Sequence, residues 1–132
     1  MRPYLKTTMN NRTILIVEDD LIDFESLKKI LVQLGYQNIM HVTNGMDALA
    51  KVRETSFDIV LMDIGLEGKL DGIETCKLME GMSRVIFTSG MHKDGETFKR
   101  IANSGSYGFI SKPFTLQQMR DALENAYAQN PN

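Results

Sequence analysis

Acidic side chains in this sequence follow two apolar runs, at the points where a strand would end. Glu18, Asp19 and Asp20 come directly after one run, and Asp63 comes directly after another. Carboxylates gathered at one place repel each other and therefore need a cation. Oxygen ligands without histidine or cysteine favour a hard divalent ion, Mg²⁺ ahead of Ca²⁺ when the ligands are few. Part of the first cluster has a simpler interpretation, because Asp20 and Asp23 are suited to capping the helix that follows.

Two further polar groups follow apolar runs later in the chain. Thr88 directly follows one run, and Lys112, itself followed by Pro113, comes two residues after the last one. A lysine beside carboxylates and a metal is an arrangement that binds phosphate, because its point charge offsets the anionic oxygens that the metal leaves uncovered. The proline favours a tight turn that fixes the direction of the lysine. The alternative interpretation of Lys112 is an ordinary surface lysine, and that of Thr88 is an ordinary β-branched strand residue.

Five short apolar runs indicate how these groups are positioned. The runs cover residues 14–17, 39–42, 59–62, 85–87 and 107–110. Their spacing suits a strand, a helix and two short loops each time. The first and third runs are continuous rather than alternating, which is typical of strands covered by helices on both faces of a parallel sheet. The pattern predicts an α/β domain with a doubly wound, five-stranded parallel sheet and helices on both faces.

The segments between the runs have helical periodicity. Leucine and isoleucine recur at helical spacing over residues 27–34, and Gly35 is placed to end that helix. Thr115 and Gln118 have the spacing of a capping box at the start of the last helix. In an open parallel sheet, ligands bind at the carboxyl ends of the strands. We therefore expect the acids, the hydroxyl and the ammonium to lie at one edge of the sheet.

Composition places the chain among ordinary globular domains. Its 132 residues are 42% hydrophobic and 24% charged with a formal net charge of -2, which gives no electrostatic footprint for direct nucleic-acid binding. The single cysteine, Cys76, suits a reducing compartment. No apolar run reaches the roughly 18 residues that a membrane span needs. We expect a cytoplasmic protein without membrane insertion, with a flexible N-terminal extension at 1–12, one domain at 13–128 and a tail at 129–132.

Five short motifs lie at the predicted strand ends and loops. They are Ile14-Leu15-Ile16-Val17-Glu18-Asp19-Asp20, Val60-Leu61-Met62-Asp63, Asp71-Gly72-Ile73-Glu74, Phe87-Thr88-Ser89 and Ser111-Lys112-Pro113-Phe114. Each is weak alone, but in this order the chain resembles the receiver (response-regulator) domain of two-component signal transduction. The resemblance covers about residues 13–128. It implies a flavodoxin-like sheet with strand order 2-1-3-4-5.

The resemblance also implies roles for the residues at the strand ends. Asp63 is implied to be the phosphoacceptor, whose carboxylate receives a phosphoryl group from a phosphohistidine donor. Mg²⁺ would be held by Glu18, Asp19, Asp63 and the backbone carbonyl of Gly65. Lys112 would pair with the acyl phosphate.

Thr88 and Phe109 match the switch hydroxyl and the switch aromatic residue of that family. Their joint movement is implied to change the packing of the face built from the fourth helix, the fifth strand and the fifth helix, which would be the output surface. The implied partners are a sensor histidine kinase or a histidine phosphotransfer protein, and a downstream protein target or a further phosphorelay step. A homodimer is an assembly that suits such a module.

The leading hypothesis is therefore a stand-alone receiver, which is a signalling domain and not a turnover enzyme. One alternative is a receiver-like interaction module that acts without phosphorylation. The loop of Ile64–Leu70 keeps this alternative open, because it is longer than is common in the family and lacks the usual proline. A small Mg²⁺-dependent phosphohydrolase is a weaker alternative, because Gly65 stands where a second acid would serve as general acid.

Overall fold

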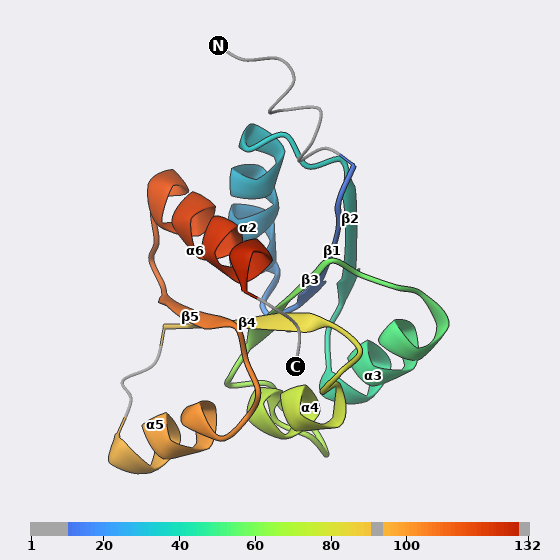
Figure 1. The fold of residues 1–132 in the computed structure, drawn as a ribbon, viewed down its shortest axis with the longest axis vertical. Helices are drawn as coiled ribbons and strands as arrows, with labels where there is room; N and C mark the ends of the chain where they lie inside the picture. Colours follow the sequence, from blue (N-terminus) through green and yellow to red (C-terminus); the bar gives the residue numbers. More distant parts are fainter. Residues whose placement is uncertain (1–10, 91–93, 130–132) are drawn as a thin grey trace.

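Strands and helices alternate along the chain in a computed structural model that describes residues 11–90 and 94–129 (Figure 1). The strands are β1 (Thr13–Val17), β2 (Asn38–Val42), β3 (Ile59–Asp63), β4 (Arg84–Ser89) and β5 (Gly108–Ser111). The helices are α2 (Leu21–Gln33), α3 (Gly45–Glu54), α4 (Gly72–Leu78), α5 (Gly95–Ala102) and α6 (Leu116–Ala128). Of the predicted terminal segments, only residues 11, 12 and 129 fall within the described part of the chain.

The strands form one parallel sheet in the order β2-β1-β3-β4-β5. Figure 1 shows α2 and α6 on one face of this sheet and α3, α4 and α5 on the other. The predicted doubly wound architecture and strand order are therefore confirmed. The chain leaves β1 for β2 on one side and later returns to β3 on the other, so the strand order reverses between β1 and β3. This reversal is where doubly wound sheets bind their ligands.

The core has two halves, one on each face of the sheet. Successive residues of a strand point to opposite faces of the sheet, so neighbouring residues of β1 and of β3 enter different halves of the core. Leu15 and Val60 pack with residues of α3 and α4 in one half. Ile16 and Leu61 pack with residues of α2 and α6 in the other. All five residues of β3 are buried, as the continuous apolar run predicts.

Side-chain caps fix where several helices begin. Asp20 caps α2 by accepting a hydrogen bond from the backbone N–H of Asp23, as predicted. The predicted capping box of Thr115 and Gln118 is present at the start of α6. None of the helices in the described ranges is both long enough and apolar enough to cross a bilayer.

Candidate functional site

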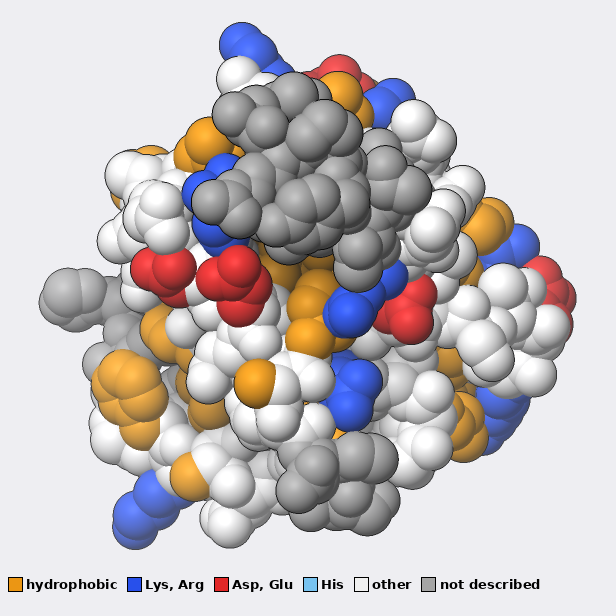
Figure 2. Space-filling view, turned by 45° about the horizontal axis from the view of Figure 1, so that its top comes forward, with side chains coloured by type: hydrophobic (Ala, Val, Ile, Leu, Met, Phe, Trp, Pro, Cys, Tyr) orange, Lys and Arg blue, Asp and Glu red, His pale blue; other side chains and the backbone are white. Residues whose placement is uncertain are grey.

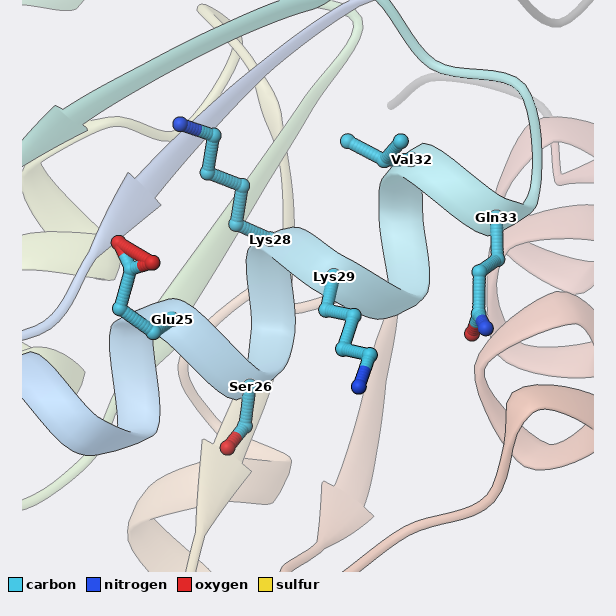
Figure 3. Close-up of a pocket in the computed structure, with 6 residues that line it drawn as sticks. All are labelled: Glu25, Ser26, Lys28, Lys29, Val32 and Gln33. Atoms are coloured by element: carbon cyan, nitrogen blue, oxygen red, sulfur yellow. The ribbon is translucent and has the colours of Figure 1, made fainter.

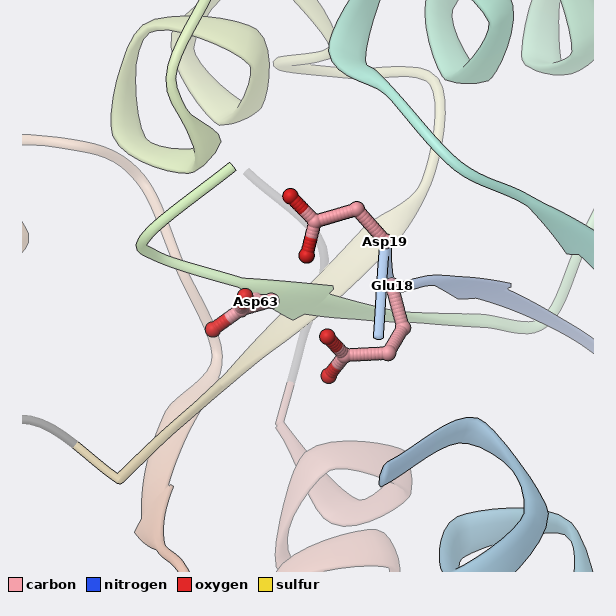
Figure 4. A group of neighbouring side chains, drawn as sticks. All are labelled: Glu18, Asp19 and Asp63. Atoms are coloured by element: carbon pink, nitrogen blue, oxygen red, sulfur yellow. The ribbon is translucent and has the colours of Figure 1, made fainter. Parts of the chain in front are cut away.

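Three carboxylates converge at the carboxyl ends of β1 and β3 (Figure 4). Glu18 and Asp19 directly follow β1, and Asp63 is the last residue of β3. One carboxylate oxygen from each of the three lies within 4.8 Å of the others. Glu18 is 1% exposed and Asp63 is 9% exposed, whereas Asp19 faces solvent. This oxygen-only group, with its excess of negative charge, fits a hard divalent cation such as Mg²⁺.

The register of the sheet and two close backbone approaches hold Asp63 in place. Asp63 pairs with Thr88 in the register of β3 and β4. The backbone N–H of Gly65 donates to Asp63 Oδ1 over 3.4 Å. Gly72, the first residue of α4, packs against the backbone of Asp63, so that a Cβ there would collide with the Asp63 carbonyl oxygen and lie 3.0 Å from Ile64 Cα. Glycine is therefore needed at position 72 for the helix to approach the acid this closely.

Backbone and ring contacts hold the other two acids. The backbone N–H of Asp20 donates to Glu18 Oε2 over 3.2 Å. The His41 ring contacts the carbonyl oxygen of Glu18, with 2.8 Å between Nε2 and O. In the loop after β3, the backbone N–H of Glu67 donates to Asp19 Oδ2 over 3.4 Å. The loop after β3 thus contacts Asp19 through its backbone.

Lys112 reaches the same cluster from the end of β5. Its Nζ donates to Glu18 Oε1 over 2.7 Å and to Asp23 Oδ2 over 3.0 Å, and it lies 3.7 Å from Asp63 Oδ1. The following peptide bond, to Pro113, is cis. The ammonium therefore belongs to the acidic site, but its hydrogen bonds go to Glu18 and Asp23 and not to Asp63.

Thr88 lies on β4 and Phe109 on the neighbouring strand β5. Thr88 is 1% exposed, and its hydroxyl has no hydrogen-bond partner among the described residues. A buried hydroxyl without a partner is unfavourable and suits a group that gains a partner when a ligand binds. Phe109, on β5, is partly buried against the half of the core under α3 and α4. Gly65 lies in an exposed turn, where its N–H contacts Asp63; the role implied for its carbonyl stays a prediction.

The family model that describes the response regulator receiver domain matches residues 14–124, which is most of the chain. The chain belongs to this family. Receiver domains take part in two-component signalling, where they bind Mg²⁺ at an acidic site and interact with histidine kinases and downstream targets. They are signalling domains and not turnover enzymes.

Curated relatives of this receiver domain include proteins of very different length. The chemotaxis protein CheY of Bacillus subtilis is 33% identical over 113 residues, which cover 83% of this chain and 92% of that protein. The transcriptional regulatory protein ZraR of Salmonella typhimurium is 32% identical over 117 residues, which cover 87% of this chain and 26% of that protein. The chain thus spans about a quarter of the length of the ZraR relatives that it matches.

Solved structures of receiver domains share the fold. The signal receiver domain of a modulated diguanylate cyclase from Desulfovibrio desulfuricans G20 is similar with a TM-score of 0.80 and 33% identity, over 87% of this chain and 92% of that chain. The CheX-CheY complex from Borrelia burgdorferi, which contains BeF3 and magnesium, is similar with a TM-score of 0.79 and 27% identity. The similarity covers 89% of this chain and 90% of that chain.

Burial dominates the electrostatics of the receiver site. Burial raises the pKa of Glu18 above its ordinary value, although the hydrogen bond from Lys112 acts against this. Burial also raises the pKa of Asp63, against the charge of Lys112 and together with the charges of Asp19 and Asp23. Burial acts to lower the pKa of Lys112, but its hydrogen bonds to Glu18 and Asp23 and the charge of Asp63 raise that pKa overall. The fold therefore holds more negative charge than one ammonium offsets.

The raised pKa of Asp63 predicts how a variant of the metal-free receiver domain responds to pH. A carboxyl group whose pKa is higher in the folded state binds more protons there, so its contribution to stability falls as pH rises from about 4 through the folded pKa. Asp63→Asn removes this cost. We expect the variant to have a larger free energy of unfolding than the native protein at pH 7, and the gain to shrink as pH falls towards 4.

Urea unfolding with a chelator present, at several pH values, measures this difference. Asp121→Asn, which alters an exposed carboxylate on α6, is the matched control and should show no such trend. A gain that is the same at all pH values would contradict the raised pKa.

Asp23 is the site residue whose role the sequence did not indicate. Its position near the start of a helix suggested a cap, and Asp20 does cap its backbone N–H. The carboxylate of Asp23 is nevertheless bound to Lys112. A signal was available, because side chains in the first turn of a helix lean back towards its N-terminus, where the strand ends lie.

Proposed function

We propose that this receiver domain accepts a phosphoryl group on Asp63 from a phosphohistidine, with Mg²⁺ bound beside the acceptor. The observation that carries the proposal is the position of Asp63 between two more carboxylates, Glu18 and Asp19, and the ammonium of Lys112. The family membership supports it further. We assign the receiver domain to residues 13–128, with flanking segments at 1–12 and 129–132.

The transfer asks little covalent chemistry of the protein. A carboxylate oxygen of Asp63 attacks phosphorus, the bond between phosphorus and the donor imidazole breaks, and its electron pair stays on the imidazole nitrogen. The product is an acyl phosphate. The contribution of the fold is to hold Asp63 fixed through Gly65 and Gly72 and to supply positive charge around the incoming group.

A metal fits the charge balance of this step. The phosphoryl group adds about -1.5 to -2 charges at neutral pH to a site that already holds several carboxylates. Glu18, Asp19 and Asp63, with the backbone carbonyl of Gly65, are the residues that would hold Mg²⁺. When bound, the ion supplies the charge that neutralises the phosphoryl oxygens. The magnesium and BeF3 in the related CheY complex support the same assignment.

Lys112 and Thr88 complete the phosphoryl site. The ammonium of Lys112, 3.7 Å from Asp63 Oδ1, pairs with a phosphoryl oxygen. The buried hydroxyl of Thr88, which has no hydrogen-bond partner in the described part of the chain, donates to another. Phe109 then shifts with Thr88 and alters the face of α5, β5 and α6.

The altered face is where the signal leaves the domain. A sensor histidine kinase or a histidine phosphotransfer protein supplies the phosphoryl group, and a downstream protein binds the face or receives the group in turn. The domain acts in the reducing cytoplasm, where the buried thiol of Cys76 stays free. A homodimer formed through the same face is an assembly that this proposal accommodates.

Intact-mass measurement tests the proposal. After incubation with acetyl phosphate and Mg²⁺, we expect the native chain to gain the mass of one phosphoryl group, and with a chelator present we expect no gain. No gain with Mg²⁺ would favour an interaction module that acts without phosphorylation. Steady release of phosphate from small phosphomonoesters would favour a phosphohydrolase.

A further inference from the structure

Lys112 is shared unequally among three carboxylates. Its ammonium donates to Glu18 over 2.7 Å and to Asp23 over 3.0 Å, whereas Asp63 Oδ1 lies at 3.7 Å, beyond hydrogen-bond distance. The lysine side chain is 15% exposed, so the water that could replace these partners is limited. The charge that the proposed function needs beside Asp63 is therefore directed towards two other acids.

Asp23 differs from the other acids around Lys112. Glu18 and Asp63 belong to the group of carboxylates that lie within 4.8 Å of one another, and Asp23 does not. Asp23 comes from the first turn of α2, and its side chain is 43% exposed. Its contact in the site is the lysine, so it has no place among the residues that would hold a cation.

The start of α2 fixes the position of Asp23. Asp20 accepts the backbone N–H of Asp23 over 3.0 Å, and this cap defines the first turn of the helix. The cap uses the backbone of Asp23 and leaves its carboxylate oxygens for Lys112. A change of the Asp23 side chain therefore leaves the cap in place.

We propose that Asp23 is a positioning residue that holds the Lys112 ammonium away from Asp63 and so weakens the binding of a phosphoryl group there. This inference rests on the proposed function and extends it to a residue outside the acidic group. When a phosphoryl group arrives, Lys112 must give up part of its contact with Asp23 to pair with the new oxygens. Asp23 also adds a negative charge near the group, because its charge is felt at Asp63. Both effects weaken the binding of a phosphoryl group at Asp63.

Beryllofluoride, a stand-in for the phosphoryl group, tests this role without chemistry. The chain has no tryptophan, so calorimetric titration with beryllofluoride and Mg²⁺ is the suitable measurement. We expect Asp23→Ala to bind beryllofluoride about fivefold more tightly than the native chain, the effect of one ion pair with an exposed partner. Asp23→Glu keeps a carboxylate at this position, and we expect its affinity for beryllofluoride to lie close to the native value.

The matched control is Glu25→Ala. Glu25 lies two residues further along α2, and Figure 3 shows it with Lys28 and Lys29 beside a hollow on the outer face of that helix. The control loses the same charge from the same helix. We expect it to bind beryllofluoride like the native chain. Mg²⁺ titration without beryllofluoride should show only a small loss of affinity in Asp23→Ala relative to Glu25→Ala, because Asp23 lies outside the acidic group and acts on the cation through its charge alone.

Each outcome decides between the assignments. A purely structural role of Asp23 would make Asp23→Ala bind more weakly, so unchanged or weaker binding would overturn the inference alone. Loss of Mg²⁺ binding in Asp23→Ala would make Asp23 a metal ligand and would also overturn it. Absence of beryllofluoride binding by the native chain would instead overturn the proposed function, and the inference with it.

Discussion

Asp63→Asn is expected to abolish phosphorylation of the chain by acetyl phosphate, with a loss of at least about a hundredfold in rate. The amide keeps the size and shape of the side chain, and it removes the anionic oxygen that would attack phosphorus. The variant also loses one of the three carboxylates of the acidic group, so the affinity for Mg²⁺ should fall at the same time. Intact-mass measurement as a function of time, at saturating Mg²⁺, measures the effect.

Two comparisons show that such a loss is chemical. Asp121→Asn makes the same substitution on the exposed side of α6 and should be phosphorylated like the native chain. The fold of Asp63→Asn should be more stable than the native fold at pH 7, since burial raises the pKa of Asp63. Phosphorylation of Asp63→Asn at the native rate would place the acceptor elsewhere and contradict the proposed function.

The strands and the convergence of the acids are the features most readily predicted from the sequence. Ile59–Met62 can only be covered on both faces, because a continuous apolar strand has no polar side for solvent. Once the strands are parallel, their ends meet at one edge, and Asp63 is brought to the acids that follow β1. These outcomes depend on the backbone pattern and not on the conformation of any side chain.

The partners of Lys112 could not be predicted in the same way. A lysine has a long side chain with several rotamers, and its direction depends on which acids surround it. The spacing of residues 18 and 112 says nothing of whether Nζ meets Glu18, Asp23 or Asp63.

The exposure of α5 is a second feature that could not be predicted from the sequence. Helical periodicity indicates the helix, but none of its residues is buried, and Phe98 is 52% exposed.

Replacing Lys112 with methionine is expected to destabilise the metal-free fold strongly at neutral pH. Lys112→Met keeps the apolar stem and removes the only cation that hydrogen-bonds Glu18 among the described residues. A buried charge left without its partner is costly. Glu18 can escape by taking up a proton, and for a carboxyl with an ordinary pKa of 4.5 this costs about 3 kcal/mol at pH 7. That figure is the upper limit of the expected loss in the free energy of unfolding, because the pKa of Glu18 is already raised in the native fold by burial.

The sign of the pH dependence distinguishes this mechanism from a loss of packing. In Lys112→Met the folded state binds a proton at Glu18 that the unfolded state releases above about pH 4.5, so the loss of stability should shrink as pH falls from 7 towards 5. A cavity would cost the same at both pH values. The double variant Lys112→Met/Glu18→Gln should recover most of the loss at pH 7, because the most deeply buried carboxylate beside position 112 is then replaced by a neutral amide.

Urea unfolding of the three proteins, with Lys29→Met as the control for an exposed lysine on α2, measures these differences. An unchanged unfolding midpoint in Lys112→Met would show that the contact with Glu18 contributes nothing to the stability of the fold.

The effect of Mg²⁺ on stability should also differ between the two proteins, since an added cation at the acidic group would supply the charge that the variant lacks. The stabilisation on adding Mg²⁺ should therefore be larger for Lys112→Met than for the native protein, because in the native protein the ammonium already offsets part of the same charge.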